Sequence, residues 1–343
     1  METRRAWRWK KVVERLKRFF GDDIKTNFIF LTIIAILYPI IYVFSPGWGV
    51  VLGHGVTWIS ALLGFNLLFG YTGLLSFGHA LFLGVGAYTV GFMYKYLGIN
   101  NIELHLLGGI LSSTVVALII GPIVVRYTRI FFAIFMLAIA QILWSLYYKF
   151  YWVTGGTDGI KIPRFSILGI SLEKLDFATY HHVYFYFVTG LTFILVYIMW
   201  RIINSPFGLT LKSIRDNETR ARFIGVDIYR ARLYAFIISA IYASITGVLA
   251  VNHHRLVTPD IAYWTTSGKV VFATLLGGAR IFIGPIVGSF VFHIIESFAM
   301  KFIYWQMVMG ILIIAIVILM PGGIAHLART LVDVAVSHRR RGG

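Results

Sequence analysis

The most constraining feature of this chain is a series of long apolar runs that contain no charged residue. Residues 28–44, 106–125 and 302–320 contain no Asp, Glu, Lys or Arg. Runs of this length cross a hydrocarbon core about 30 Å thick as α-helices. In lipid only helices or closed barrels satisfy their backbone, and unbroken runs lack the alternation of barrel strands. The sequence therefore predicts an all-α, polytopic bundle of transmembrane helices.

The composition excludes several other classes of protein. Hydrophobic residues make up 58% of the chain and charged residues only 13%, whereas about a quarter of a soluble domain is charged. The formal net charge of +17 comes from basic residues beside the ends of apolar runs, as the positive-inside rule describes for cytoplasmic segments. We therefore expect no nucleic-acid partner. Cysteine is absent, which excludes a disulfide framework and a thiolate nucleophile or Cys-based metal site.

Charge bias predicts how the chain crosses the bilayer. The expected helices cover residues 28–44, 49–69, 79–98, 105–125, 131–152, 182–200, 231–251 and 302–320. Both chain ends and the loop at 201–230 are basic, so we place them in the cytoplasm of a multi-pass protein of the cell (inner or plasma) membrane. Region 268–300 must then cross an even number of times, as a re-entrant hairpin or as two short crossings. The total is 8 to 10 crossings.

The chain divides into three parts. Residues 1–27 form a basic N-terminal segment in which Trp9, Val12 and Leu16 recur at helical spacing, which favours an amphipathic helix on the anionic leaflet over a frayed tail. Residues 28–320 form the transmembrane domain. Residues 321–343 form a basic cytoplasmic tail.

Glycine interrupts the apolar sequence near 70–78 and again near 277–288. Broken segments in both halves of a membrane chain are the best sequence indication of a transport path, because freed backbone groups need protein, water or substrate as partners. The alternative is that the glycines only permit close helix packing. The candidate path residues are Gly70, Gly73, Ser76, Phe77, His79, Gly277, Gly278, Gly284 and Pro285.

The loop at 204–230 is too regular in pattern for a plain connector. Asn204 or Ser205 is placed to cap a helix with Pro206 at its first position, and Gly225 is placed to end it. We expect one polar helix that points Arg215, Glu218 and Arg222 outward and packs an apolar face against another surface. That face comprises Phe207, Leu211, Ile214 and Phe223. The loop is thus a candidate cytoplasmic docking element, with a solvated linker helix as the alternative.

Four motifs in order resemble the permease subunits of bacterial and archaeal ABC importers for branched-chain amino acids, the LivM-like family, over roughly residues 28–325. The first spans 70–80 and continues through Gly84, Gly86 and Tyr88; the others are 154–160, 205–225, and 276–278 with Gly284, Pro285 and Gly288. The chain departs from the family pattern at Arg280 and Gly322, where a glycine and an arginine are usual.

The resemblance implies one of two permease chains that pair across the membrane, two ABC ATPase subunits and an extracytoplasmic binding protein that delivers leucine, isoleucine or valine. The 204–230 segment would be the ATPase-coupling loop, with Pro206, Phe207, Gly208, Arg215, Glu218, Ala221 and Gly225 as its matching residues. The chain has no GxxxxGK[ST] loop, so the partner subunits would hydrolyse ATP. We expect no cofactor and no enzyme activity in this chain. The alternatives are an ABC permease for urea or short amides and an ion-coupled secondary transporter.

Overall fold

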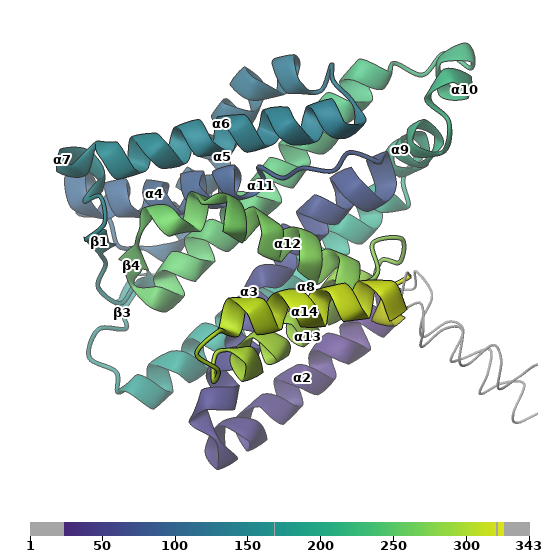
Figure 1. Ribbon diagram of the computed structural model, residues 1–343. Coiled ribbons are helices and arrows are strands. Elements are labelled where there is room, and N and C mark those ends of the chain that lie inside the picture. The colour runs from purple at the N-terminus through teal and green to yellow at the C-terminus, as the bar shows by residue number, and fades with distance from the viewer. Residues whose placement is uncertain (1–23, 168, 320–321, 326–343) are drawn as a thin grey trace, which may run out of the picture. The chain divides into compact units, whose positions relative to one another are not determined.

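The computed structural model describes residues 24–167, 169–319 and 322–325, and it is built of helices (Figure 1). Among the described residues, six segments are long and apolar enough to cross a membrane: α2 (Ile24–Phe44), α3 (Pro46–Asn66) with the π-helical η1 (Leu67–Thr72), α5 (Ile102–Val124), α6 (Arg129–Lys149), α8 (Phe177–Ile203) and α11 (Ile228–His254). The predicted all-α membrane fold is confirmed. Residues 1–23 and 326–343, where we expect the amphipathic segment and most of the basic tail, lie outside the described residues.

Shorter elements complete the chain. Predicted span 79–98 corresponds to α4 (Ala80–Leu97), span 302–320 to α14 (Trp305–Leu319), and region 268–300 contains α12 (Trp264–Gly277) and α13 (Gly284–Ala299). The loop at 204–230 contains α9 (Pro206–Asp216) and α10 (Glu218–Phe223). The remaining elements are α7 (Tyr151–Thr154), η2 (Pro259–Ala262), β1 (Ile160–Lys161), β2 (Ser166–Ile167), β3 (Ile170–Ser171) and β4 (Leu256–Val257). The strands pair antiparallel as β1–β4 and β2–β3.

The chain folds as two compact units. The larger unit comprises residues 53–271, and the smaller one comprises residues 1–52 and 272–343. Each unit is described by itself below.

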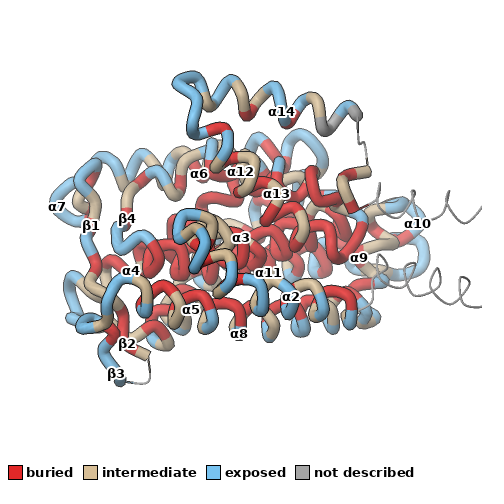
Figure 2. The backbone as a smooth tube through the Cα atoms, turned by 90° about the horizontal axis from the view of Figure 1, so that it is seen from below, coloured by how far each residue is buried: buried red, intermediate tan, exposed pale blue. Residues whose placement is uncertain are grey.

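The core of the larger unit is built around α11, which is mostly buried (Figure 2). Small residues bring α11 against α4: a Cβ atom at Gly247 would meet the backbone of Leu83, and one at Gly86 would meet the backbone of Ser244. The Ser244 hydroxyl also donates to the Gly109 carbonyl of α5 at 2.8 Å. Close packing of this kind holds membrane helices together, because lipid supplies no hydrophobic driving force between them.

An irregular segment follows α11 and runs back along α4. A Cβ atom at Gly91 would lie 3.3 Å from Val257, and one at Gly84 would lie 2.6 Å from Ala262. At the start of α4, the backbone N–H of Ala80 donates to the hydroxyl of Ser267 at 2.8 Å. Residues 255–263 therefore form an irregular segment alongside α4, which contains only the short strand β4 and the single 3-10 turn η2. The sequence analysis did not predict this segment.

The smaller unit contains a helical hairpin. Gly277 at the end of α12 packs directly on the backbone of Gly284 at the start of α13. Gly278, with φ of 108°, makes the turn, and a Cβ atom there would lie 2.7 Å from the carbonyl oxygen of Gly322. The turn between α12 and α13 thus lies beside the residues that follow α14. At the other end of α13, Phe298 contacts Trp48 with ring centroids 5.2 Å apart.

Candidate functional site

Helix α9 begins as the sequence predicts. Ser205 caps it by accepting a hydrogen bond from the Gly208 N–H, and Pro206 occupies the first turn. Gly208 is buried, and a Cβ atom there would collide with the backbone of Ile203. Leu211 and Ile214 form the buried face, and Phe207 is half-buried.

The predicted single helix is two helices, which corrects the sequence interpretation. The chain breaks at Asn217, where φ is −161°, and the Asn217 side chain accepts from the Arg220 N–H to cap α10. An asparagine competes for backbone hydrogen bonds and favours such a cap over a helix interior. Ala221 of α10 is buried, whereas Phe223, which we expected to pack on another surface, is 86% exposed. Gly225 follows in the left-handed conformation at φ of 87° with open space around it.

Arg215 joins α9 to the first broken segment. Its Nη1 donates to the Gly70 carbonyl oxygen at 2.6 Å, and its other guanidinium nitrogens bind Asp216. Gly73, at φ of 81°, ends η1, and a Cβ atom there would lie 3.2 Å from the Arg215 side chain. The ammonium of Lys212 lies 5.4 Å from the centre of the Tyr71 ring. We expected Arg215 to point outward; instead it satisfies a carbonyl that the π-helical turn leaves available.

Glu218 joins α10 to α11. Both of its oxygens accept from Arg232, at 2.8 and 3.3 Å, and Arg222 adds an ion pair at 3.5 Å. The Arg232 side chain is only 7% exposed and that of Glu218 is 36% exposed. The Arg232 hydrogen bond holds the pKa of the Glu218 carboxyl below its ordinary value of 4.5. Glu218 is therefore bound within the chain and does not point outward as the sequence predicted.

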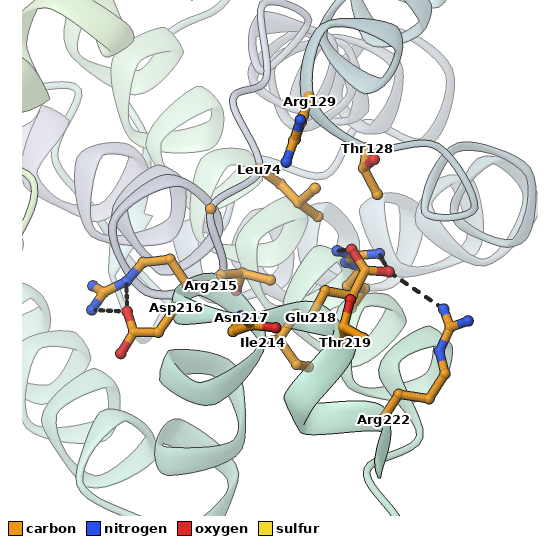
Figure 3. Close-up of a pocket in the computed structure, with 13 residues that line it drawn as sticks. Leu74, Thr128, Arg129, Ile214, Arg215, Asp216, Asn217, Glu218, Thr219 and Arg222 are labelled. Carbon is orange, nitrogen blue, oxygen red and sulfur yellow. Dashed lines mark hydrogen bonds and ion pairs between the residues drawn. The ribbon is translucent and has the colours of Figure 1, made fainter.

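A cavity of about 460 Å³ lies between these helices, the end of η1 and the start of α6 (Figure 3). Arginine side chains enter its lining from α6, α9, α10 and α11, and the carboxylates of Asp216 and Glu218 lie on its floor. Thr72, Gly73 and Leu74 contribute the end of the broken segment. Helices α9 and α10 and the first glycine break therefore share one polar cavity.

The first break also buries polar groups that lack partners. Ser76 and His79 are 0% exposed and Asn66 is 1% exposed. The Ser76 hydroxyl, both ring nitrogens of His79 and the Asn66 amide make no hydrogen bond to any described residue. The His79 ring lies 5.5 Å from that of Phe65, whereas Phe77 is 38% exposed. Unpaired buried polar groups are rare in native proteins and need an explanation.

The second break is the α12–α13 hairpin of the smaller unit. It brings Gly277, Gly278 and Gly284 together at the turn, with Pro285 in the first turn of α13. Here the glycines serve close backbone contact, which the sequence analysis held open as the alternative.

Three residues that contribute to the site were missed by the sequence analysis. These are the polar residues Arg232, Asn66 and Ser267, which lie inside or at the ends of apolar helices. Their position in apolar helices was the sequence feature that could have identified them. An ionisable residue within a membrane span is a functional candidate by default.

The order of these elements fits one family of membrane proteins. The sequence profile for the permease component of the branched-chain amino acid transport system matches residues 49–317. This chain belongs to that permease family. It is a permease component of an ABC transport system and not a catalytic subunit. The matched residues include η1, the helices α9 and α10, and the α12–α13 hairpin.

Individual relatives agree with the family assignment. The high-affinity branched-chain amino acid transport system permease protein LivM of Escherichia coli strain K12 is 24% identical over 90% of this chain and 77% of its own length. LivM of Salmonella typhimurium strain LT2 is 24% identical over 87% of this chain and 74% of its own length. The permease protein LivH of the same organism is 24% identical over 80% of this chain and 92% of its own length. No solved structure matches the chain.

Proposed function

We propose that this permease component forms, with a second permease subunit, the membrane path of an ABC importer for leucine, isoleucine and valine. The observation that carries the proposal is the contact of α9 with η1, where Arg215 donates to the Gly70 carbonyl at 2.6 Å. It connects a helix in the basic loop directly to the broken membrane segment.

Ten crossings follow from charge bias and packing together. The basic loop at 201–230 puts the coupling helices in the cytoplasm, and the cytoplasmic end of α14 is then at Gly322. The contact of Gly278 with Gly322 supports an arrangement in which α12 and α13 each cross, with the irregular segment after α11 completing the α12 crossing. Both chain termini are cytoplasmic in this arrangement.

The proposed path passes the start of α4 in the larger unit. The ring of Phe65 in α3 contacts that of His79. The preceding residue, Gly64, packs against Ser239, which lies eleven residues into α11 and so about 16 Å from its cytoplasmic end. That depth is near the middle of a core about 30 Å thick. Two helices begin there, α4 and α12, and helix N-termini attract the carboxylate of an amino acid. The unpaired groups of Ser76 and His79 supply further polar partners to a passing substrate.

Coupling would use two contacts of the cytoplasmic helices. When two ATPase subunits close on ATP, movement of α9 pulls on η1 through Arg215, and movement of α10 pulls on α11 through Glu218 and Arg232. Because α11 packs tightly on α4, both contacts act on the same break. Nucleotide then shifts the population between outward-open and inward-open packings. The exposed Phe223 and Ile224 present an apolar surface to the ATPase subunits.

The experiment is co-purification followed by transport. The chain is co-expressed with the second permease subunit and two ATPase subunits of its transporter, as wild type and as Phe223→Asp, with Ile170→Asp as a matched control at an exposed position in β3. We expect Phe223→Asp alone to lose the ATPase subunits while membrane insertion is retained. Proteoliposomes holding the complex and a binding protein should then take up radiolabelled leucine with ATP. Uptake of urea or acetamide in place of leucine would replace the proposed substrate, and uptake driven by an ion gradient without ATP would overturn the proposal.

A further inference from the structure

The cavity of about 460 Å³ beside the coupling helices carries a surplus of positive charge. Four guanidinium groups line it, from Arg129, Arg215, Arg222 and Arg232, against the two carboxylates of Asp216 and Glu218. The four arginines exceed the two carboxylates by two, so the lining of the cavity carries two net positive charges. The volume falls in the range of about 300–1,000 Å³ that is typical of small-molecule sites.

The four arginines differ in how far their hydrogen-bonding capacity is used. Arg215 is bound to Asp216 and to the Gly70 carbonyl, and Arg222 pairs with Glu218. Arg232 binds Glu218 through its two terminal nitrogens, but its Nε is buried without an acceptor among the described residues. A buried guanidinium nitrogen without an acceptor is costly, and Arg232 is one of the residues that line the cavity.

Arg129 is the least engaged of the four. It makes no hydrogen bond or ion pair within the part of the chain that the structure describes, and in Figure 3 it extends from the start of α6 toward the cavity. Its φ is 53°, a conformation that costs energy for a residue with a side chain and persists where the surroundings hold it. Arg129 thus adds an exposed positive charge to the lining of the cavity, where it interacts electrostatically with Glu218 and helps to lower the pKa of that carboxyl.

From these observations we propose that the cavity binds a phosphate group, held by the guanidinium groups of Arg129 and Arg222 in a lining with surplus positive charge. Guanidinium groups match the geometry of phosphate oxygens and form charge-assisted hydrogen bonds with them. The phosphate belongs to a small soluble phosphate compound or to an anionic lipid headgroup; basic pockets between helices on the cytoplasmic side of a membrane bind such headgroups. A phosphate there would bridge α6 to α10 and so restrain the coupling helices.

The test measures phosphate binding to the purified full-length chain in a neutral detergent. Equilibrium dialysis with radiolabelled inorganic phosphate is compared for wild type, Arg129→Gln and Arg222→Gln, at constant ionic strength. The matched control is Arg126→Gln, which removes one exposed guanidinium from the same loop outside the cavity, where Arg126 lies over the Tyr229 ring. We expect saturable binding to wild type and to Arg126→Gln, with affinity at least tenfold weaker in Arg129→Gln and in Arg222→Gln.

A second arm distinguishes the sources of the phosphate. The same proteins are placed in nanodiscs of phosphatidylcholine with or without phosphatidylglycerol. If wild type and Arg126→Gln bind phosphate in discs of phosphatidylcholine alone but not in discs that contain phosphatidylglycerol, the lipid headgroup occupies the cavity. If phosphate binding is the same in both kinds of disc, the cavity binds a soluble phosphate compound.

Two results would overturn the proposal. One is equal loss of affinity in Arg126→Gln and Arg129→Gln, which would assign binding to general surface charge. The other is the absence of saturable phosphate binding to wild type both in detergent and in discs of phosphatidylcholine alone, which would show that the cavity does not bind phosphate. Binding is measured on the chain alone, so failure of the transport proposal leaves this test intact.

Discussion

Two arginines connect the short helices α9 and α10 to the long apolar segments of the larger unit. Arg215 reaches a backbone carbonyl and Asp216 at once, and Arg232 binds both oxygens of Glu218. The planar guanidinium makes such double contacts, whereas the lysine ammonium is a point charge. These positions are thus specific for arginine and not only for positive charge.

Replacement of Arg215 tests the contact with the broken segment. We expect Arg215→Lys to assemble with its ATPase subunits but to transport at least about tenfold more slowly per ATP hydrolysed, because a hydrogen bond from a charged donor contributes about 1.5–3 kcal/mol. Uptake and ATP hydrolysis are measured in the same proteoliposomes. The control is Arg230→Gln, whose exposed ion pair with Asp227 lies away from η1. Equal uptake per ATP in Arg215→Lys and wild type would refute this role.

The Glu218–Arg232 pair predicts a pH dependence of stability. The folded-state pKa of Glu218 lies below its ordinary value of 4.5, chiefly through the Arg232 hydrogen bond. The pair therefore stabilises the fold above about pH 5 and loses this contribution as pH falls below 4.5 through the lowered pKa. Because Glu218 is 36% exposed, the effect is screened and modest. The unfolding temperature of wild type should exceed that of Glu218→Gln at pH 7, and the difference should shrink toward pH 3.5; a constant difference would contradict the assignment.

At the residue scale, the sequence predicted local contacts and missed distant ones. The Ser205 cap and Pro206 were predictable because both act within one turn of their own positions. Arg232 was not, since its partner Glu218 lies fourteen residues earlier in a separate helix. For the same reason Arg215 and Glu218 were expected to face outward. A tertiary partner decides the direction of a long charged side chain, and composition carries no information about it.

At the scale of elements, two glycines with the same backbone conformation have different surroundings. Gly73 and Gly225 have φ of 81° and 87°, so alanine strains either position by about 1–2 kcal/mol. Only at Gly73 would the new Cβ press on Arg215, whereas nothing lies within 4 Å at Gly225. We expect both alanine variants to lose similar stability but only Gly73→Ala to lose leucine uptake. Equal uptake by the two would show that the α9–η1 contact does not transmit movement.

The α4–α11 interface gives a second matched pair of glycines. A Cβ at Gly247 would meet the Leu83 backbone, whereas Gly190 in α8 has nothing within 4 Å. Gly247→Ala should lower stability by about 1–3 kcal/mol through overpacking, while Gly190→Ala should be neutral or stabilising by up to about 1 kcal/mol. Thermal unfolding in detergent, followed by tryptophan fluorescence, measures both. A stabilised Gly247→Ala would mean that the two helices are not in close contact.

Helices were easier to predict than the interruptions between them. The glycine break near 70–78 was visible because three glycines fall in nine residues. The irregular segment at 255–263 was not, since β-branched and aromatic residues there resemble the adjoining spans; the signals were Pro259 and Asp260. Its backbone is tolerated because it lies along α4, with Ala262 against Gly84, and not against lipid.

At the scale of the whole molecule, parity of crossings was predictable but their nature was not. Charge bias requires an even number of membrane crossings between α11 and α14. It does not distinguish a re-entrant hairpin from two full crossings. Helices α12 and α13, with 14 and 16 residues, span about 21 and 24 Å, short of a core about 30 Å thick. Length alone thus favours a re-entrant hairpin. The contact of Gly278 with Gly322 favours two crossings, because it puts the turn at the cytoplasmic end of α14.

The absence of cysteine allows a direct test of this topology, because each introduced thiol is the only one in the chain. Arg280→Cys, at the exposed turn between α12 and α13, should react with a membrane-impermeant maleimide only in inside-out vesicles. Thr219→Cys in α10 should behave in the same way, and Ser171→Cys in β3 should react only in right-side-out vesicles. Labelling of Arg280→Cys from the outside, with the two reference positions as expected, would make α12 and α13 a re-entrant hairpin and reduce the crossings to eight. Labelling from the inside requires both helices to cross, so the irregular backbone before α12 then lies within the membrane, beside the proposed path.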